Sequence, residues 1–93
     1  MSVVIIGGHD RMVCRYKQLC KQYKCKAKVF TQMSARLKDQ IGSPDLIVVF
    51  TNTVSHKMTK CALCEAHRAQ SQLVRCHTSS SNALEKILAE HAC

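Results

Sequence analysis

Four short apolar runs divide the chain, and none of them alternates regularly with polar positions. They cover residues 2–6, 27–30, 46–50 and 72–76, and the run at 46–50 is the most strongly apolar. Short runs rich in β-branched residues and without polar alternation are typical of strands in a parallel sheet buried on both faces. The pattern therefore predicts four strands of such a sheet.

Between these runs, apolar residues recur at the spacing of amphipathic helices. We expect a helix over residues 10–23 with Asp10 as its N-cap, and a shorter one over 34–40 that Gly42 and Pro44 terminate. The apolar stripe expected in the first of these two helices is Val13, Tyr16, Cys20 and Tyr23.

Two further helices are expected in the second half of the chain. The third begins after Thr53 or Ser55 and runs to Ala69, and the fourth begins near Ser80 or Asn82, where Asn82 and Glu85 have capping-box spacing. The residues expected to face the core are Val54, Met58, Cys61, Ala62 and Ala66 in the third helix, and Leu84, Ile87, Leu88 and His91 in the fourth.

This alternation of strands and helices predicts the α/β class. Right-handed crossovers would give a small parallel four-stranded sheet with helices on both faces, flavodoxin- or Rossmann-like, with strand order 2-1-3-4. The 93 residues, 1–93, suffice for one domain. The point at which the chain changes direction across the sheet then lies between strands one and three, where ligands bind in such folds.

Three histidines follow directly on predicted strands. His9 follows the first strand, His56 the third and His77 the fourth, whereas His67 and His91 lie within helices. Neutral imidazole is the commonest protein ligand for zinc, copper and iron. We therefore expect a small ligand-binding or sensor domain with a histidine-ligated metal centre. The more specific expectation is haem with one or two of these side chains as axial ligands, rather than a transition metal ion held by two or three of them.

Hydroxyl-rich loops at the same strand ends suggest a different ligand. Hydroxyls and free N–H groups at helix N-termini form cradles for phosphate, nucleotides or carboxylates, although such residues also cap helices in the ordinary way. The sequence contains neither a dinucleotide-binding glycine fingerprint nor a Walker motif. The residues expected around a ligand, whether haem or an anion, are Gly8, Asp10, Arg11, Thr51, Asn52, Thr53, Ser55, Thr78, Ser79 and Ser80.

The formal net charge of +8 is concentrated in one segment, because half of the fourteen basic residues lie between Arg11 and Lys28. This segment is interpreted as a solvated helix face or as a surface for an anionic partner, which makes the chain a candidate adaptor. Tyr16 and Tyr23 have the spacing of core residues, so nucleic acid is not the favoured partner. With so small a core, we also expect a homodimer.

Composition narrows the class of protein further. Seven cysteines, an odd number, show no secretory framework, and Cys61 and Cys64 form a single pair within a helix, so we interpret them as reduced thiols in a cytoplasmic protein. No charged-then-apolar leader and no long apolar segment is present, so we expect neither secretion nor membrane insertion. Catalysis is not indicated, since only Asp10 among the six acidic residues lies near the expected site. The roles of Cys61, Cys64 and Cys93 stay open.

Three phrases at the strand ends resemble a known family. They are VVIIGGHDRM, PDLIVVFTNTVSH and HTSSSN. They resemble the short bacterial Rossmann-like proteins of the family called domain of unknown function 2325, and the resemblance covers nearly the whole chain. It implies a Rossmann-like fold and a signature in these three loops, and it implies no particular activity.

Overall fold

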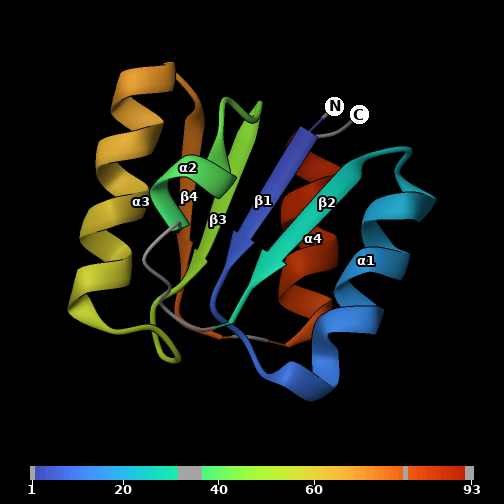
Figure 1. The fold of residues 1–93 in the computed structure, drawn as a ribbon. Coiled ribbons are helices and arrows are strands. Elements are labelled where there is room, and N and C mark those ends of the chain that lie inside the picture. Colours follow the sequence, from blue (N-terminus) through green and yellow to red (C-terminus); the bar gives the residue numbers. More distant parts are fainter. Residues whose placement is uncertain (1, 32–36, 79, 92–93) are drawn as a thin grey trace.

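Four parallel strands form one sheet at the centre of the molecule (Figure 1). The computed structural model describes residues 2–31, 37–78 and 80–91. The strands are β1 (Ser2–Ile6), β2 (Lys26–Phe30), β3 (Leu46–Phe50) and β4 (Gln72–Cys76), in the order β2-β1-β3-β4. The predicted fold class and strand order are therefore confirmed, and β2 begins one residue earlier than predicted.

The two central strands are buried on both faces because apolar residues fill every position except Ser2 at the start of β1. In β1, Val3 and Ile5 join one core cluster, whereas Val4 and Ile6 join the other. Every residue of β3 is fully buried. Removal of an aliphatic side chain of this size from water contributes about 1.5–3 kcal/mol, so these two strands stabilise both halves of the core.

Helices cover both faces of the sheet. One face carries α1 (Val13–Gln22) and α4 (Ser81–His91), and the other carries α2 (Leu37–Ile41) and α3 (His56–Ala69) (Figure 1). The expected helix at 34–40 is described only from residue 37, because 32–36 lie outside the described residues. The expected end of the third helix at Ala69 is confirmed, and Ser55 is its N-cap, with Oγ accepting from Met58 N–H at 3.3 Å.

The first helix does not begin as predicted. A 3₁₀ turn, η1 (Asp10–Met12), precedes α1, and the N-cap position of that turn is His9. Asp10 is therefore not the N-cap of α1. Its carboxylate instead accepts a hydrogen bond from the hydroxyl of Thr31, which follows β2. An ionised carboxylate forms strong charge-assisted hydrogen bonds. Here the donor is a hydroxyl from a distant loop rather than an N–H of the helix backbone.

α4 begins close to the first of its two predicted positions, Ser80, whereas the capping box predicted at Asn82 does not form. The helix begins at Ser81, and Ser80 Oγ accepts a hydrogen bond from Ala83 N–H at 3.3 Å. Asn82 therefore lies inside the first turn, and the capping box that it was expected to form with Glu85 is absent. Ser is an equally good N-cap, and the four consecutive hydroxyl residues left the choice open.

Most residues expected in the core are buried, and Leu19 of α1 and Glu65 of α3 are buried although neither was expected there. Tyr16 and Cys20 of α1, Met58, Ala62 and Ala66 of α3, and Leu84, Ile87 and Leu88 of α4 are buried. The other expected residues, Val13, Tyr23, Val54, Cys61 and His91, are half-buried. Glu65 of α3 is only 1% exposed, and its Oε2 forms an ion pair with Nη2 of Arg68 at 2.9 Å but accepts no hydrogen bond within the described residues. A buried carboxylate of this kind is costly, and nothing in the helical pattern predicted it.

No disulfide joins the cysteines of the described segments. Cys20 is buried beside Cys25, and burial followed by the charge of Cys25 raises the pKa of the Cys20 thiol from 9.0 to about 11. This thiol therefore stays protonated and unreactive at neutral pH. Among the described residues, no helix is long and apolar enough to cross a membrane.

Candidate functional site

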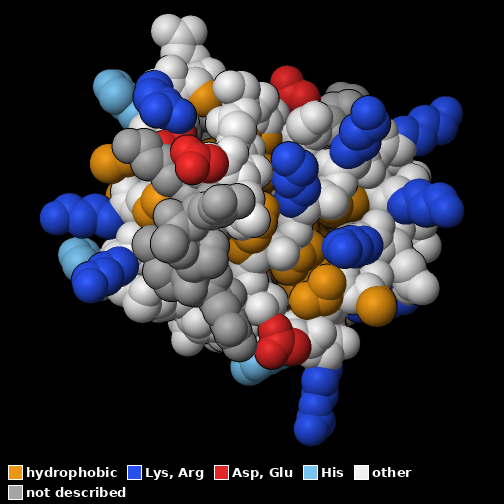
Figure 2. Space-filling view, in the orientation of Figure 1, with side chains coloured by type: hydrophobic (Ala, Val, Ile, Leu, Met, Phe, Trp, Pro, Cys, Tyr) orange, Lys and Arg blue, Asp and Glu red, His pale blue; other side chains and the backbone are white. Residues whose placement is uncertain are grey.

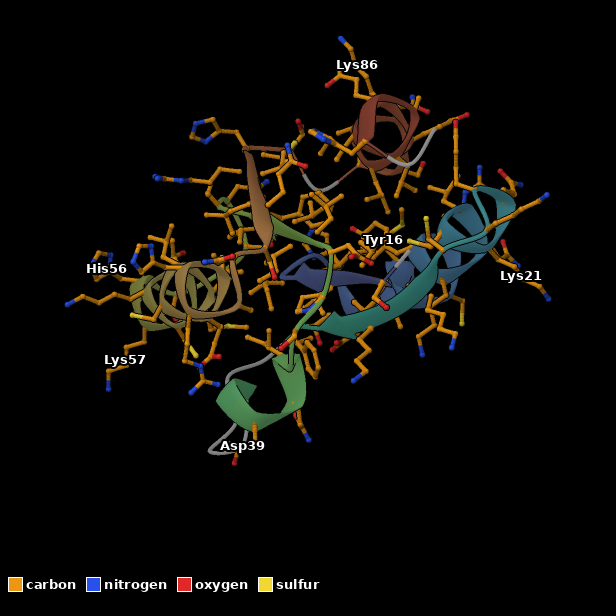
Figure 3. All side chains as sticks on the ribbon, turned by 90° about the horizontal axis from the view of Figure 1, so that it is seen from above. Tyr16, Lys21, Asp39, His56, Lys57 and Lys86 are labelled. Carbon is orange, nitrogen blue, oxygen red and sulfur yellow. The ribbon has the colours of Figure 1, made fainter. Side chains whose placement is uncertain are left out.

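The ends of the parallel strands bring the predicted site residues to one edge of the sheet. β1, β3 and β4 all point the same way, so the loops that follow them share the lower edge in Figure 1. His9 lies three residues after β1, His56 begins α3, and His77 directly follows β4. All three imidazoles are exposed. Figure 3 shows His56 extending from the outer side of α3, away from the sheet.

Two glycines make the tight turn out of β1. Gly7 and Gly8 have φ angles of +101° and +87°, which side chains with a Cβ rarely adopt. Gly7 N–H donates to Phe30 O at 2.7 Å, at the end of β2. A Cβ on Gly8 would lie 2.6 Å from Tyr16 Cε2, so this position also needs glycine for space.

Thr53 fastens the loop after β3 to the loop after β1. Its Oγ1 accepts a hydrogen bond from Gly8 N–H at 2.7 Å and donates to Phe50 O at 3.1 Å. The hydroxyl thus connects the ends of β1 and β3, the two strands between which the strand order reverses. The predicted site residues Gly8 and Thr53 are therefore in contact. The Gly8 N–H and the Thr53 hydroxyl are both engaged in this hydrogen bond, which shapes the crevice.

Thr51 and His77 meet because the strands before them are paired in register. Phe50 of β3 is the partner of Cys76 in β4, so the residues that follow each strand are also neighbours. Thr51 Oγ1 lies 3.1 Å from His77 Nδ1 and 3.4 Å from Cys76 O. Thr51 N–H also donates to Cys76 O at 2.8 Å. Nδ1 of His77 is therefore within hydrogen-bond distance of Thr51, and the His77 side chain is exposed to solvent.

The turn after His9 is a shallow hollow at the same edge. It is lined by His9, Asp10, Arg11 and Met12. His9 O accepts from Met12 N–H at 2.8 Å, which closes the 3₁₀ turn. Within the described residues, no hydrogen bond engages the imidazole of His9, and the side chain of Arg11 is exposed. The hollow therefore presents an unengaged imidazole beside a guanidinium.

The remaining predicted ligand residues act largely as local supports. Ser55 and Ser80 cap helices, as described above. Thr78 O accepts from Cys76 Sγ at 3.1 Å. The side chain of Asn52 is exposed, and Ser79 lies outside the described residues.

A pre-assembled ion site is not present in the described part of the chain. No group of three His, Cys, Asp or Glu side chains there is close enough to hold a metal ion. Met58, the methionine closest in sequence to His56, is 3% exposed and belongs to the core, as expected. Cys64 and His67 are exposed along α3, and Cys93 lies outside the described residues.

Sequence reasoning found the histidines but missed the residues that position them. Thr51, expected near a ligand, contacts His77 in the structure. Thr31 binds the carboxylate of Asp10. Strand register would have revealed the first pair, because each residue directly follows one of two adjacent strands. No local signal indicated the second.

Solved structures similar to this chain show its fold. Two de novo designed Rossmann fold proteins match with a TM-score of 0.64, at 12% and 11% identity, and cover 97% and 98% of this chain and 95% of theirs. A de novo designed Rossmann 2x2 fold protein, solved by NMR in solution, also has a TM-score of 0.64, at 13% identity over 99% of this chain and 87% of its own. At such identities these likenesses concern the fold alone.

Comparison by sequence identifies the family. No protein with a curated description matches this chain. A family model described as "Uncharacterized protein conserved in bacteria (DUF2325)" matches residues 2–91, which include all three strand-end loops. The chain therefore belongs to the DUF2325 family of uncharacterized bacterial proteins, as the resemblance of those loops predicted.

Proposed function

We propose that this protein binds haem at the carboxyl edge of its sheet, with His77 Nε2 as an axial ligand of the iron. The observation that carries the proposal is the contact between Thr51 Oγ1 and His77 Nδ1 at 3.1 Å. Metal-ligating histidines usually have their second ring nitrogen held by a neighbouring group, which orients the ring. Thr51 occupies that supporting position.

Thr51 can also set the tautomer of His77, because its oxygen accepts from Nδ1 whenever its own proton is donated elsewhere. The hydroxyl has a single proton, and Cys76 O, 3.4 Å from Oγ1, is a pure acceptor. When Thr51 donates to that carbonyl, its oxygen must accept from His77, so the proton resides on Nδ1. The lone pair of Nε2 is then free to coordinate iron.

The absence of a three-residue cluster favours haem over a bare ion. A tetrahedral zinc site takes three or four protein ligands, and the described residues contain no group of three suitable side chains close together. A porphyrin supplies four nitrogen ligands itself, so one imidazole is sufficient. The solvent-facing ring of His77 meets that smaller requirement.

Other residues of this edge would complete the site. His9, whose imidazole is exposed and unengaged in the described structure, is the candidate for a second ligand. Arg11 is exposed and positively charged, which suits the propionates of haem. His56 is given no ligand role here, because it extends from the outer side of α3. Free cysteines accord with a protein that works in the reducing cytoplasm.

A haemin titration tests the proposal. We expect the Soret band of added haemin to shift with wild-type protein, His77→Ala to abolish the shift, and Thr51→Val to weaken binding by about tenfold, since second-shell changes typically cost 10–100-fold. His67→Ala, which removes an exposed imidazole from α3, is the matched control and should bind as wild type. Equal haemin affinity in wild type and His77→Ala would reject the proposal.

The phosphate-binding alternative has less structural support. Ser55, Ser80 and Thr53 already accept main-chain N–H groups, which ordinary capping and loop closure explain. Protection against thermal unfolding by inorganic phosphate, reduced in Thr53→Val and unchanged in His77→Ala, would favour this alternative over haem.

A further inference from the structure

The outer edge of β2 is open along its length. β2 is the last strand on its side of the sheet, so none of the described strands pairs with it there. An unpaired strand edge presents a row of free N–H and C=O groups, which is a template for another strand. Ala27 and Val29 are only half-buried along this edge.

A groove follows this open edge. Its floor is formed by the β2 residues 27–30, Lys17 of α1 lines one side, and Asp39 and Gln40 of α2 line the other. Lys28 Nζ lies 3.4 Å from Gln40 O and so crosses part of the groove. The edge is therefore both unpaired and accessible.

The surroundings of the groove are strongly basic. Figure 2 shows Lys and Arg side chains gathered over the part of this face that β2 and α1 form. Among the described residues, no ion pair engages any of these lysines, and Asp39 is the one acid that lines the groove. The exposed lysines of the groove and its flanks are Lys17, Lys21, Lys24, Lys26 and Lys28.

We propose that an acidic, extended segment of a partner protein binds along this groove by adding a strand to β2. Such a segment supplies main-chain acceptors and donors that match the edge, and its carboxylates match the lysines. A nucleic acid would match the charge but would leave the edge carbonyls without donors. A second copy of β2 would place lysine opposite lysine, which is destabilising.

A charge-matched pair of variants tests the electrostatic part. The probe is a dye-labelled peptide of about eight residues that alternates Glu and Val. We expect Lys17→Gln/Lys26→Gln/Lys28→Gln to weaken its binding about fivefold, since exposed pairs contribute roughly 0.3–0.5 kcal/mol each. Lys57→Gln/Lys60→Gln/Lys86→Gln removes the same charge from exposed positions elsewhere and should change binding less than about twofold.

Backbone methylation of the probe tests strand addition. The same peptide with alternate amides N-methylated cannot pair with an edge strand, and we expect its binding to fall by about tenfold or more. In NMR spectra, the Ala27 and Val29 amides should shift with the unmodified peptide. Three results would overturn the proposal: equal weakening by both triple variants, equal binding of the methylated peptide, or tighter binding of duplex DNA than of the peptide at the same salt.

Discussion

Gly8 lies in the turn that leads into the candidate site, at the point where this turn adjoins the core. Its φ is +87°, and an added Cβ would lie 2.6 Å from Tyr16 Cε2 and 2.8 Å from Tyr16 Oη. The ring of Tyr16 is fully buried and packs on Phe50 with ring centroids 5.4 Å apart. Figure 3 shows Tyr16 between the sheet and α1, so it has little freedom to move aside.

We therefore predict that Gly8→Ala destabilises the protein by about 2–4 kcal/mol, from backbone strain and overpacking together. Urea unfolding followed by circular dichroism measures the loss. Gly42→Ala is the control, because Gly42 has φ +65° and no heavy atom within 4 Å of the added Cβ. It should cost only about 1–2 kcal/mol, the penalty of the left-handed conformation. Equal losses in the two variants would contradict the steric argument.

Some residues could be read from the sequence, and others could not, for a physical reason. The histidines were found because each follows a strand, which is a local relation. The partners of Asp10 and Gly8 lie 21 and 45 positions away, and local spacing does not encode such contacts. Glu65 was missed because its position on α3 is buried by neighbouring elements, whereas charged residues in helices are usually exposed.

At the scale of elements, the strands were predicted more accurately than the helix starts. β1, β3 and β4 have the predicted bounds. The uninterrupted apolar runs of β1 and β3 mark strands that are buried on both faces, whereas β4 is an edge strand whose Gln72 and Arg75 are exposed. The starts of α1 and α4 depended instead on which of several polar side chains made the capping bond. Local geometry decides which of several neighbouring polar side chains forms the capping bond, and the residue types alone do not predict it.

The cap of α4 yields a direct prediction. Ser80→Ala removes the oxygen that accepts from Ala83 N–H and should cost about 1 kcal/mol. Asn82→Ala changes an exposed residue inside the first turn and should alter stability by less than about 0.5 kcal/mol. Thermal and urea unfolding of both variants give the comparison. A larger loss in Asn82→Ala would show that Asn82 caps the helix after all.

At the scale of the whole molecule, the sheet ends in two unlike edges. The β2 edge carries Lys26 and Lys28, whereas β4 carries one charge, Arg75, beside the half-buried Leu73 and Val74. Lysines on an edge strand oppose pairing with an identical strand. The β4 edge is therefore the one suited to a second copy of this chain. A domain of this size buries only about 60–65% of its unfolded surface, so association has stability to add.

We predict that the protein is a homodimer joined along β4. Light scattering coupled to size-exclusion chromatography at micromolar concentration should give twice the chain mass of 10.4 kDa. Gln72→Lys adds a charge to the β4 edge and should shift the protein toward the monomer, because a like charge from each copy is brought into the interface. Gln22→Lys adds the same charge to an exposed position at the end of α1 and should leave the mass unchanged. A monomer mass for the wild type, both alone and with haemin, would exclude this assembly. A dimer that survives Gln72→Lys would instead place the interface on another face.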